Sequence, residues 1–315
     1  MNLYSTKRDP DGGCSSGRGP PAESPGGAVA TLAAASFAVV AWGLTPAATK
    51  LAVGEIDALT VGILRTVLAM APGLPLALAL RLPLPTGGGD WRLLAISAVC
   101  GFVGFPLLFG IGVNLTTTAH AALIMAALPI FTGLFGAVVE RRRPARPWWR
   151  GAALALAGEV VLVGARFGFE EPGASLEGDF LTLASCIVGA AGYVAGSRLS
   201  PRIGTWSTTF WGLSLGGMVL LPLLAIRLDA TDWDAVTVVG WNAAGYLALF
   251  STVLAYVCWY WALARGGTAR IGSVQFAQPV VALGAAVTAM GEVMTMPLAV
   301  ATVAILAGIA IAQRN

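Results

Sequence analysis

Charged residues are scarce in this sequence, and it has a single histidine. Only 11% of the 315 residues are charged, against 57% that are hydrophobic. So little polar surface cannot coat a water-soluble globule, which excludes an ordinary soluble domain and a nucleic-acid partner. One histidine, with no Asp or Glu at ligand spacing, argues against a membrane-embedded enzyme, a metal site or a cofactor. A channel is also disfavoured, since no TVGYG-like filter occurs.

The four cysteines lack any paired spacing. Cys14, Cys100, Cys186 and Cys258 lie far apart, and three of them fall within apolar stretches. Disulfide frameworks and zinc sites need cysteines at short, recurring spacings. We therefore interpret these cysteines as small residues that pack among apolar neighbours.

Long apolar stretches fill the chain from Ala28 to Gln313. Each is near the roughly 20 residues that an α-helix needs to cross a bilayer. The sequence predicts ten transmembrane helices, at about residues 28–50, 58–80, 92–113, 117–139, 148–166, 179–198, 206–227, 237–264, 270–291 and 294–313. The expected fold class is an all-α membrane protein embedded in the lipid bilayer. Residues 1–27, rich in Gly, Pro and Ser, are expected to be a disordered tail.

The two halves of the chain match each other at a constant offset of 150 positions. Thr118–Pro129 (TAHAALIMAALP) is echoed by Thr268–Pro279 (TARIGSVQFAQP), and Ala157-Gly158 by Ala307-Gly308. Self-similar halves recur in secondary transporters. We expect two repeats of five helices each, over residues 28–166 and 177–313.

The basic residues gather on one side of the predicted membrane. If the amino terminus is cytoplasmic, fifteen Lys and Arg fall in inner segments and three in outer ones. The loop ERRRPARPWWR supplies several of the fifteen, and such a bias orients membrane proteins. Acidic residues, Asp179 among them, are expected outside. Ten spans then place both termini in the cytoplasm, and five spans per half invert the second repeat relative to the first.

Prolines fall inside four of the predicted spans. They are Pro46, Pro106, Pro129 and Pro279, in spans 1, 3, 4 and 9. Each removes a backbone donor and leaves a carbonyl that lipid cannot satisfy. A packing kink or a helix break beside a hydrated cavity would account for any one of them. The matching repeat positions of Pro129 and Pro279 favour a central, functional location for that pair.

Polar side chains at membrane depth are further candidates, because charge there is costly unless it is paired or hydrated. Arg65 would bind a substrate carboxylate, or else pair with an acid or reach the outer interface. Glu159 would relay a proton or form a structural pair. His120 would act as a hydrogen-bonded helix-start residue or as a switch. Gln275 and Gln278 have no evident reason to lie in an apolar helix, which makes them candidates for substrate contact.

Aromatic side chains complete the candidate site. Trp42 and Thr45 flank the predicted kink of the first span, and Tyr193 lies one position from the repeat equivalent of Trp42. Tyr256 and Trp259 share one face of the eighth span. They would form either a cavity wall that stacks a planar or cationic ligand, or part of an aromatic belt at the interface.

Several of these segments resemble a known family. The runs TTTAHAALIMAALPIF and ALARGGTARIGSVQFAQPVVALGAAVTAMGE, with Trp42-Gly43 in the first span, are similar to the EamA-type units of the drug/metabolite transporter superfamily. Within it the chain resembles YddG-type exporters of aromatic and other neutral amino acids. The resemblance implies a multi-pass transporter of the bacterial inner membrane, compatible with a monomer. It also implies alternating access to a central cavity built from spans 1, 3, 4, 6, 8 and 9.

The small number of internal charges narrows the expected substrate. A sugar-phosphate path would show several deep Lys or Arg residues, whereas only Arg65 lies clearly inside. A zwitterion can be bound by helix ends, amides and aromatic rings. A lipophilic cation would require a membrane-embedded acid, for which Glu159 is the internal candidate. We expect a small-molecule substrate, neutral or aromatic amino acids first, with efflux of small cationic drugs as the alternative.

Overall fold

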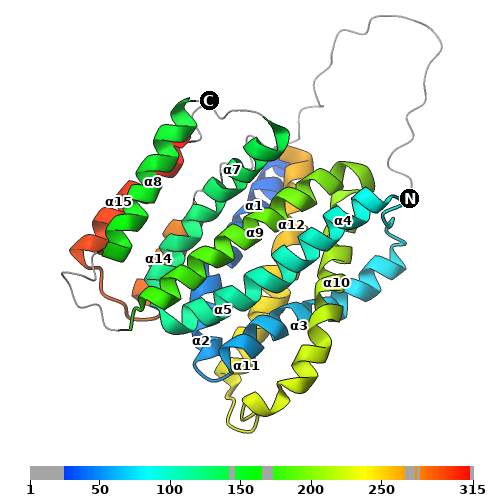
Figure 1. Ribbon diagram of the computed structural model, residues 1–315, viewed down its shortest axis with the longest axis horizontal. Coiled ribbons are helices and arrows are strands. Elements are labelled where there is room, and N and C mark those ends of the chain that lie inside the picture. Colours follow the sequence, from blue (N-terminus) through cyan, green and yellow to red (C-terminus); the bar gives the residue numbers. More distant parts are fainter. Residues whose placement is uncertain (1–24, 142–145, 165–172, 267–273, 275–276, 313–315) are drawn as a thin grey trace, which may run out of the picture.

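The computed structural model describes residues 25–141, 146–164, 173–266, 274 and 277–312. In this part of the chain every regular element is a helix (Figure 1). Seven segments are long and apolar enough to cross a membrane: Gly27–Val53, Ala58–Ala79, Gly88–Leu115, Thr118–Val139, Leu176–Ile203, Thr205–Ile226 and Val238–Trp259. With the shorter helices α8 (Arg146–Gly164), α14 (Ala277–Thr288) and α15 (Met296–Ala312), they make ten helical rods. The chain is therefore an all-helical membrane protein, as its composition predicts.

Four rods consist of more than one helical element. The first joins α1 (Pro25–Gly43) to α2 (Thr45–Val53), and the third joins α4 (Gly88–Ile96), the π-helix η1 (Ser97–Gly104) and α5 (Phe105–Leu115). The fourth joins α6 (Thr118–Ile124), the 3₁₀-turn η2 (Met125–Ala127) and α7 (Leu128–Glu140). The eighth joins α11 (Val238–Gly245), the π-helix η5 (Tyr246–Leu254) and α12 (Ala255–Gly266). The unbroken rods include α3 (Ala58–Ala79), α9 (Leu176–Ile203) and α10 (Thr205–Ile226).

Three of the predicted prolines stand next to these interruptions. Each is the second residue of the helix that begins after an interruption: Pro46 in α2, Pro106 in α5 and Pro129 in α7. A proline has no N–H, so the helical ladder before it must change its pattern. Pro279 likewise lies in the first turn of its helix, α14, and at such a position a missing N–H costs little.

The two π-helices occupy equivalent places in the two halves. The 150-residue offset maps Ser97–Gly104 onto residues 247–254, and η5 covers Tyr246–Leu254. In the first of them, the carbonyl of Phe102 lies four residues before Pro106. It accepts a hydrogen bond from Thr66 Oγ1 at 2.7 Å. A side chain of α3 thus occupies the carbonyl that the proline leaves without its helical donor.

Short polar side chains and one glycine set several helix ends. Asp57 accepts from the backbone N–H of Thr60 at 2.9 Å, and Ser175 accepts from that of Gly178 at 2.9 Å. These are N-caps, which satisfy donors that a helix start leaves free. Gly204, with a φ of +91°, lets the chain turn from α9 into α10.

The structure corrects two predicted span boundaries. The third rod begins at Gly88 rather than near residue 92, because its exposed first turn continues the helix past the apolar stretch. The sixth rod runs to Ile203 rather than residue 198, although Pro201 lies in its last turn. Hydropathy marks the part of a helix that lies in lipid, and helices extend beyond that part.

The third rod and α9 run antiparallel and pack through glycines. A Cβ atom added at Gly192 would lie 2.6 Å from the backbone nitrogen of Gly101, and one at Gly178 would lie 2.6 Å from the carbonyl carbon of Leu115. Such close backbone approach is typical of helix pairs inside membranes. The equivalent pair, with the two halves exchanged, is the first rod with the eighth, and α1 and α12 of these rods are likewise in contact.

The helices α8 and α15 form a tight antiparallel pair at one edge of the bundle (Figure 1). The matching dipeptides that end in Gly158 and Gly308 lie on their contact. An added Cβ atom would lie 2.8 Å from Ile305 at the first position and 2.5 Å from the nitrogen of Ala155 at the second. The sequence match between the halves therefore corresponds to a packing requirement.

At the end of the bundle where Asp57 lies, called here the Asp57 end, an ion pair joins the two halves. Arg227 donates to the Asp57 carboxylate at 2.8 Å. Burial raises the pKa of Asp57, but hydrogen bonds from Arg227 and Thr60, with the charge of Arg227, outweigh it and hold this pKa below the usual value of 3.8.

A lowered pKa makes Asp57 a source of acid sensitivity. Its contribution to stability is complete above the unfolded-state pKa and is lost as the pH falls below about 4, through the lowered folded-state value. We expect the thermal midpoint of Asp57→Asn to fall less on acidification than that of the wild type. Thermal unfolding at a series of pH values measures this, with the exposed Asp232→Asn as control. Parallel curves for wild type and Asp57→Asn would contradict the assignment.

Candidate functional site

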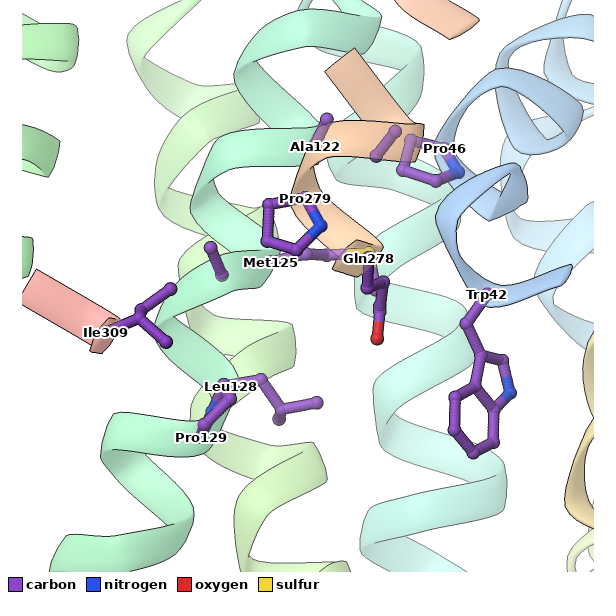
Figure 2. Close-up of a pocket in the computed structure, with 11 residues that line it drawn as sticks. Trp42, Pro46, Ala122, Met125, Leu128, Pro129, Gln278, Pro279 and Ile309 are labelled. Carbon is purple, nitrogen blue, oxygen red and sulfur yellow. The ribbon is translucent and has the colours of Figure 1, made fainter. Parts of the chain in front are cut away.

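A pocket lies where the first, fourth, ninth and tenth rods meet. Its cavity volume is about 60 Å³, within a wider space of about 590 Å³ among the lining atoms that includes open solvent. Mostly apolar side chains from both halves of the chain line it (Figure 2): Trp42, Pro46, Ala122, Met125, Ala126, Leu128, Pro129, Gln278, Pro279, Ala282 and Ile309. Five of the residues singled out in the sequence thus meet here, the matching prolines Pro129 and Pro279 among them.

Gln278 is the polar side chain of this pocket. Figure 2 shows its amide oxygen directed into the space between Leu128 and Trp42. Within the described part of the chain the Gln278 amide forms no hydrogen bond with another residue. An amide in an apolar pocket is a group that can orient a ligand.

Trp42 ties the first rod to the eighth. Its Nε1 donates to the backbone carbonyl of Ser251 at 2.9 Å. Its ring packs edge-on with the rings of Tyr256 and Trp259, with ring centroids 5.3 and 5.4 Å apart. Beside it, the Thr45 and Ser251 hydroxyls are 2.8 Å apart. Thr45, almost fully buried, therefore faces η5 rather than the pocket, whereas Trp42 both packs against α12 and lines the pocket.

Arg65 points across the bundle to the same segment of η5. Its Nε donates to Thr252 Oγ1 and its Nη2 to Ser251 Oγ, each at 3.2 Å, and its guanidinium lies 5.6 Å from the Phe105 ring. Among the described residues it forms no ion pair, and it does not reach toward the Asp57 end. Neither structural alternative expected for Arg65 is found there.

Two tyrosine hydroxyls meet between α9 and α12. Tyr193 and Tyr256 are hydrogen-bonded at 2.9 Å, and Tyr193 is partly exposed in spite of its place near the middle of a span. Tyr256 also lies 6.3 Å from the ring of Phe102 on η1. Tyr193 and Tyr256 thus face each other inside the bundle rather than forming a belt at the interface.

His120 lies in a buried polar cluster at the Asp57 end. Its backbone N–H donates to Thr117 Oγ1, as expected for a helix-start residue, and its Nδ1 lies 3.0 Å from Asp179 Oδ2. The Asp179 carboxylate also accepts from Thr116 Oγ1 at 2.5 Å. Asp179, an acid expected on the outer side, lies in the first turn of α9 and is buried, at 2% exposure.

Two further charged residues hold this end together. Lys50 donates to the carbonyls of Val113 and Thr116 at 2.9 and 2.6 Å. The carboxylate of Glu292 accepts from the backbone N–H groups of Thr118 and Ala119 at 2.6 and 2.8 Å. A residue of the second half of the chain thus caps the start of the fourth rod. The start of a helix carries partial positive charge, which the negative charge of Glu292 stabilises.

Some predicted residues are not brought to the pocket. Gln275 lies outside the described residues, and nothing is described of the side chain of Glu159. Its helix α8 packs against α15 at the edge of the bundle (Figure 1). The backbone of Pro106, in the third rod, packs against Gly62 of α3, and Pro106 does not line the pocket. No group of His, Cys, Asp or Glu suited to a metal ion occurs among the described residues.

The decisive comparison is with protein families. The EamA-like transporter family matches residues 30–164 and again residues 176–313. The chain belongs to the EamA-like transporter family. It is a multi-pass member of the drug/metabolite transporter superfamily, as its sequence motifs indicate, and EamA-like proteins form a transporter family and not an enzyme family.

Three relatives show how far the similarity extends. The uncharacterized transporter YdeK of Bacillus subtilis is 32% identical over 85% of this chain and 91% of the relative. A probable amino-acid metabolite efflux pump of Salmonella typhimurium is 28% identical over 87% and 92%. The aromatic amino acid exporter YddG of Ancylobacter novellus is 29% identical over 69% and 74%.

Proposed function

We propose that this EamA-like protein is a secondary transporter of the bacterial inner membrane that exports neutral or aromatic amino acids by alternating access. The observation that carries the proposal is the pocket built by both halves, with Pro129 and Pro279 on facing helices. Transporter sites are commonly formed where two repeats meet at interrupted helices.

The chemistry of the pocket supports a small, partly apolar substrate. Prolines, alanines, Leu128 and Met125 supply apolar surface, and Trp42 supplies a flat aromatic face. Gln278 supplies an amide that has no partner among the described residues. Two of the relatives are named for amino-acid or amino-acid metabolite export. Side chains of neutral amino acids fit such a lining, and the amide orients their polar ends.

Alternating access requires two arrangements of the halves, and we propose an inverted repeat as their basis. The excess of Lys and Arg in the predicted inner segments supports cytoplasmic termini. The antiparallel pairing of α8 with α15, and of the third rod with α9, supports the inversion. The Asp57 end is then the outer face.

The contacts at that outer face must change during transport. Glu292 of the second half caps the fourth rod of the first half, and Arg227 of the second half binds Asp57 of the first. While these bonds hold, the halves are joined on the outer side. Opening of the pocket toward the outer side would break these bonds. The arrangement described here, closed on the outer side, would then be one of the two states in the cycle.

Replacement of Gln278 by Ala should slow transport without unfolding the protein. Loss of one hydrogen bond to the substrate corresponds to roughly three- to tenfold weaker transport at low substrate concentration. Flux of labelled phenylalanine, tryptophan, threonine and methionine into proteoliposomes measures this. Trp42→Phe keeps an aromatic ring but loses the bond to Ser251, and we expect a comparable loss.

The exposed residues Asn242 and Trp91 provide matched controls, since Asn242→Ala and Trp91→Phe should transport as the wild type does. The absence of flux for all four amino acids from folded wild-type protein would refute the proposal. The same flux measured with and without a proton gradient tests coupling. If collapse of the gradient leaves the flux unchanged, neither His120 nor Glu159 moves a proton in the cycle.

A further inference from the structure

We infer that the transported substrate carries a carboxylate, that Arg65 binds this carboxylate, and that the same charge rejects cationic compounds. The inference rests on the proposed transport function and narrows its substrate class. It assigns to one residue the choice between the two substrate classes that the sequence leaves open.

The first support is the number of N–H donors that Arg65 has to spare. A guanidinium has five of them in a fixed plane. Thr252 and Ser251 each take one, so three have no partner among the described residues. In that part of the chain the buried side-chain atoms without a partner belong to Thr118 and Arg227. The Nη1 atom of Arg65, which has no partner among the described residues, is therefore not fully buried.

The second support is the absence of a compensating acid among the described residues. Within the described residues the partners of Arg65 are two neutral hydroxyl groups and the Phe105 ring, so no acid there compensates its positive charge. Asp179 and Glu292 are held elsewhere, by His120 and Thr116 and by the start of the fourth rod. An uncompensated charge at membrane depth is expensive and as a rule serves function. A substrate carboxylate would compensate it through two parallel hydrogen bonds.

The third support is the link between Arg65 and the pocket. The hydroxyl of Ser251 accepts from Arg65 while the carbonyl of the same residue accepts from Trp42. Arg65 and Ser251 are not among the residues that line the pocket, and Ser251 links the guanidinium to the Trp42 indole, which is one of them. A small amino acid bound by its carboxylate at Arg65 would place its side chain near Trp42 and the Phe105 ring, where aromatic faces favour planar or apolar groups.

The same geometry disfavours cationic substrates. Two unit charges of like sign repel strongly where water is sparse, because the effective dielectric constant is low. A compound with only an amine has no group for Arg65, and in the described part of the bundle no free carboxylate faces it. Selectivity would therefore come from repulsion of cations as much as from attraction of carboxylates.

Competition for labelled phenylalanine uptake by wild-type protein in proteoliposomes tests the inference directly. The competitors are phenylalanine, 3-phenylpropionate, phenylalaninamide and phenethylamine. We expect the first two, which carry a carboxylate, to compete at least tenfold better than the amide and the amine. Competition of equal strength by all four would overturn the inference and leave amino-acid transport intact. Failure of labelled phenylalanine, threonine and methionine to move at all would instead refute the proposed function.

Variants at Arg65 distinguish binding from a structural role. Arg65→Gln should raise the half-saturation concentration for phenylalanine at least tenfold, and Arg65→Lys should lose less. Because the Arg65 charge is not paired within the described protein, its removal should leave the thermal midpoint unchanged or raise it. Arg92→Gln, at an exposed arginine, should match the wild type in both respects. Transport by Arg65→Gln at the wild-type rate would overturn the inference. If Arg65→Gln unfolds, the competition experiment on the wild type decides, and equal competition by all four compounds would overturn the inference.

Discussion

Replacement of Gly192 by Leu should destabilise the protein by about 3 kcal/mol and abolish transport. The Cβ atom would lie 2.6 Å from the nitrogen and 2.8 Å from the Cα of Gly101, and both of these atoms belong to the backbone of η1. A side chain can rotate out of a clash, whereas a helix backbone can only move as a whole. Overpacking of this kind costs one to a few kcal/mol, and here it sits at the upper end.

Separation of α9 from η1 would also disturb the candidate site. Gly192 precedes Tyr193, whose hydroxyl meets Tyr256, and η1 carries Phe102, which packs against the same tyrosine. Any shift of α9 therefore reaches the aromatic residues between the sixth, third and eighth rods. We expect transport to fall even in preparations that retain helical content.

The matched control is the same substitution at a helical glycine with free space. An added Cβ atom at Gly284 of α14 meets nothing within 4 Å. Gly284→Leu should leave stability unchanged or increase it slightly, since leucine favours helix more than glycine does. Thermal unfolding of both purified variants, followed by size-exclusion profiles, measures the difference. Equal midpoints for Gly192→Leu and the wild type would contradict the packing argument.

The membrane fold could be predicted from the sequence because hydropathy alone selects helices that cross a bilayer. The repeat offset also predicted a packing contact, since its matching residues Gly158 and Gly308 both lie where α8 packs against α15. The π-helix η5 could not be predicted in this way. No proline marks it, and its hydrogen bonds with Trp42 and Arg65 come from distant parts of the chain.

The candidate site could be predicted in part, for a related reason. Trp42, Gln278 and the matching prolines stand out as unusual residues in apolar spans, and the structure brings them together. Ser251 escaped notice because serine is ordinary in membrane helices, and only the fold places it between Trp42 and Arg65. The π-helix η5, in which it lies, has no proline to mark it in the sequence.

Asp179 shows what the charge pattern leaves out. The pattern predicts the side of the membrane on which an acid lies, but it cannot recognise a partner elsewhere in the chain. The partner is His120, 59 positions away and equally buried. An ionisable residue near a span end can therefore be internal when a complementary residue begins the neighbouring helix.

Replacement of Asp179 by Leu should cost about 3–5 kcal/mol, because it leaves the polar partners of a buried carboxylate without an acceptor. His120 is 1% exposed and Thr116 is fully buried, so neither can turn to water. The thermal midpoint of purified protein should fall accordingly. Asp234→Leu, at an exposed acid, provides the control and should change the midpoint little.

The double variant His120→Leu with Asp179→Leu separates the pair from the individual residues. Replacement of both buried polar partners by apolar side chains is commonly tolerated, whereas removal of one is not. We therefore expect the double variant to be more stable than Asp179→Leu alone. If the two single losses simply add, the buried pair does not act as a unit. A stable double variant that still exports amino acids would further show that the pair holds the fourth rod against α9 and carries no proton during transport.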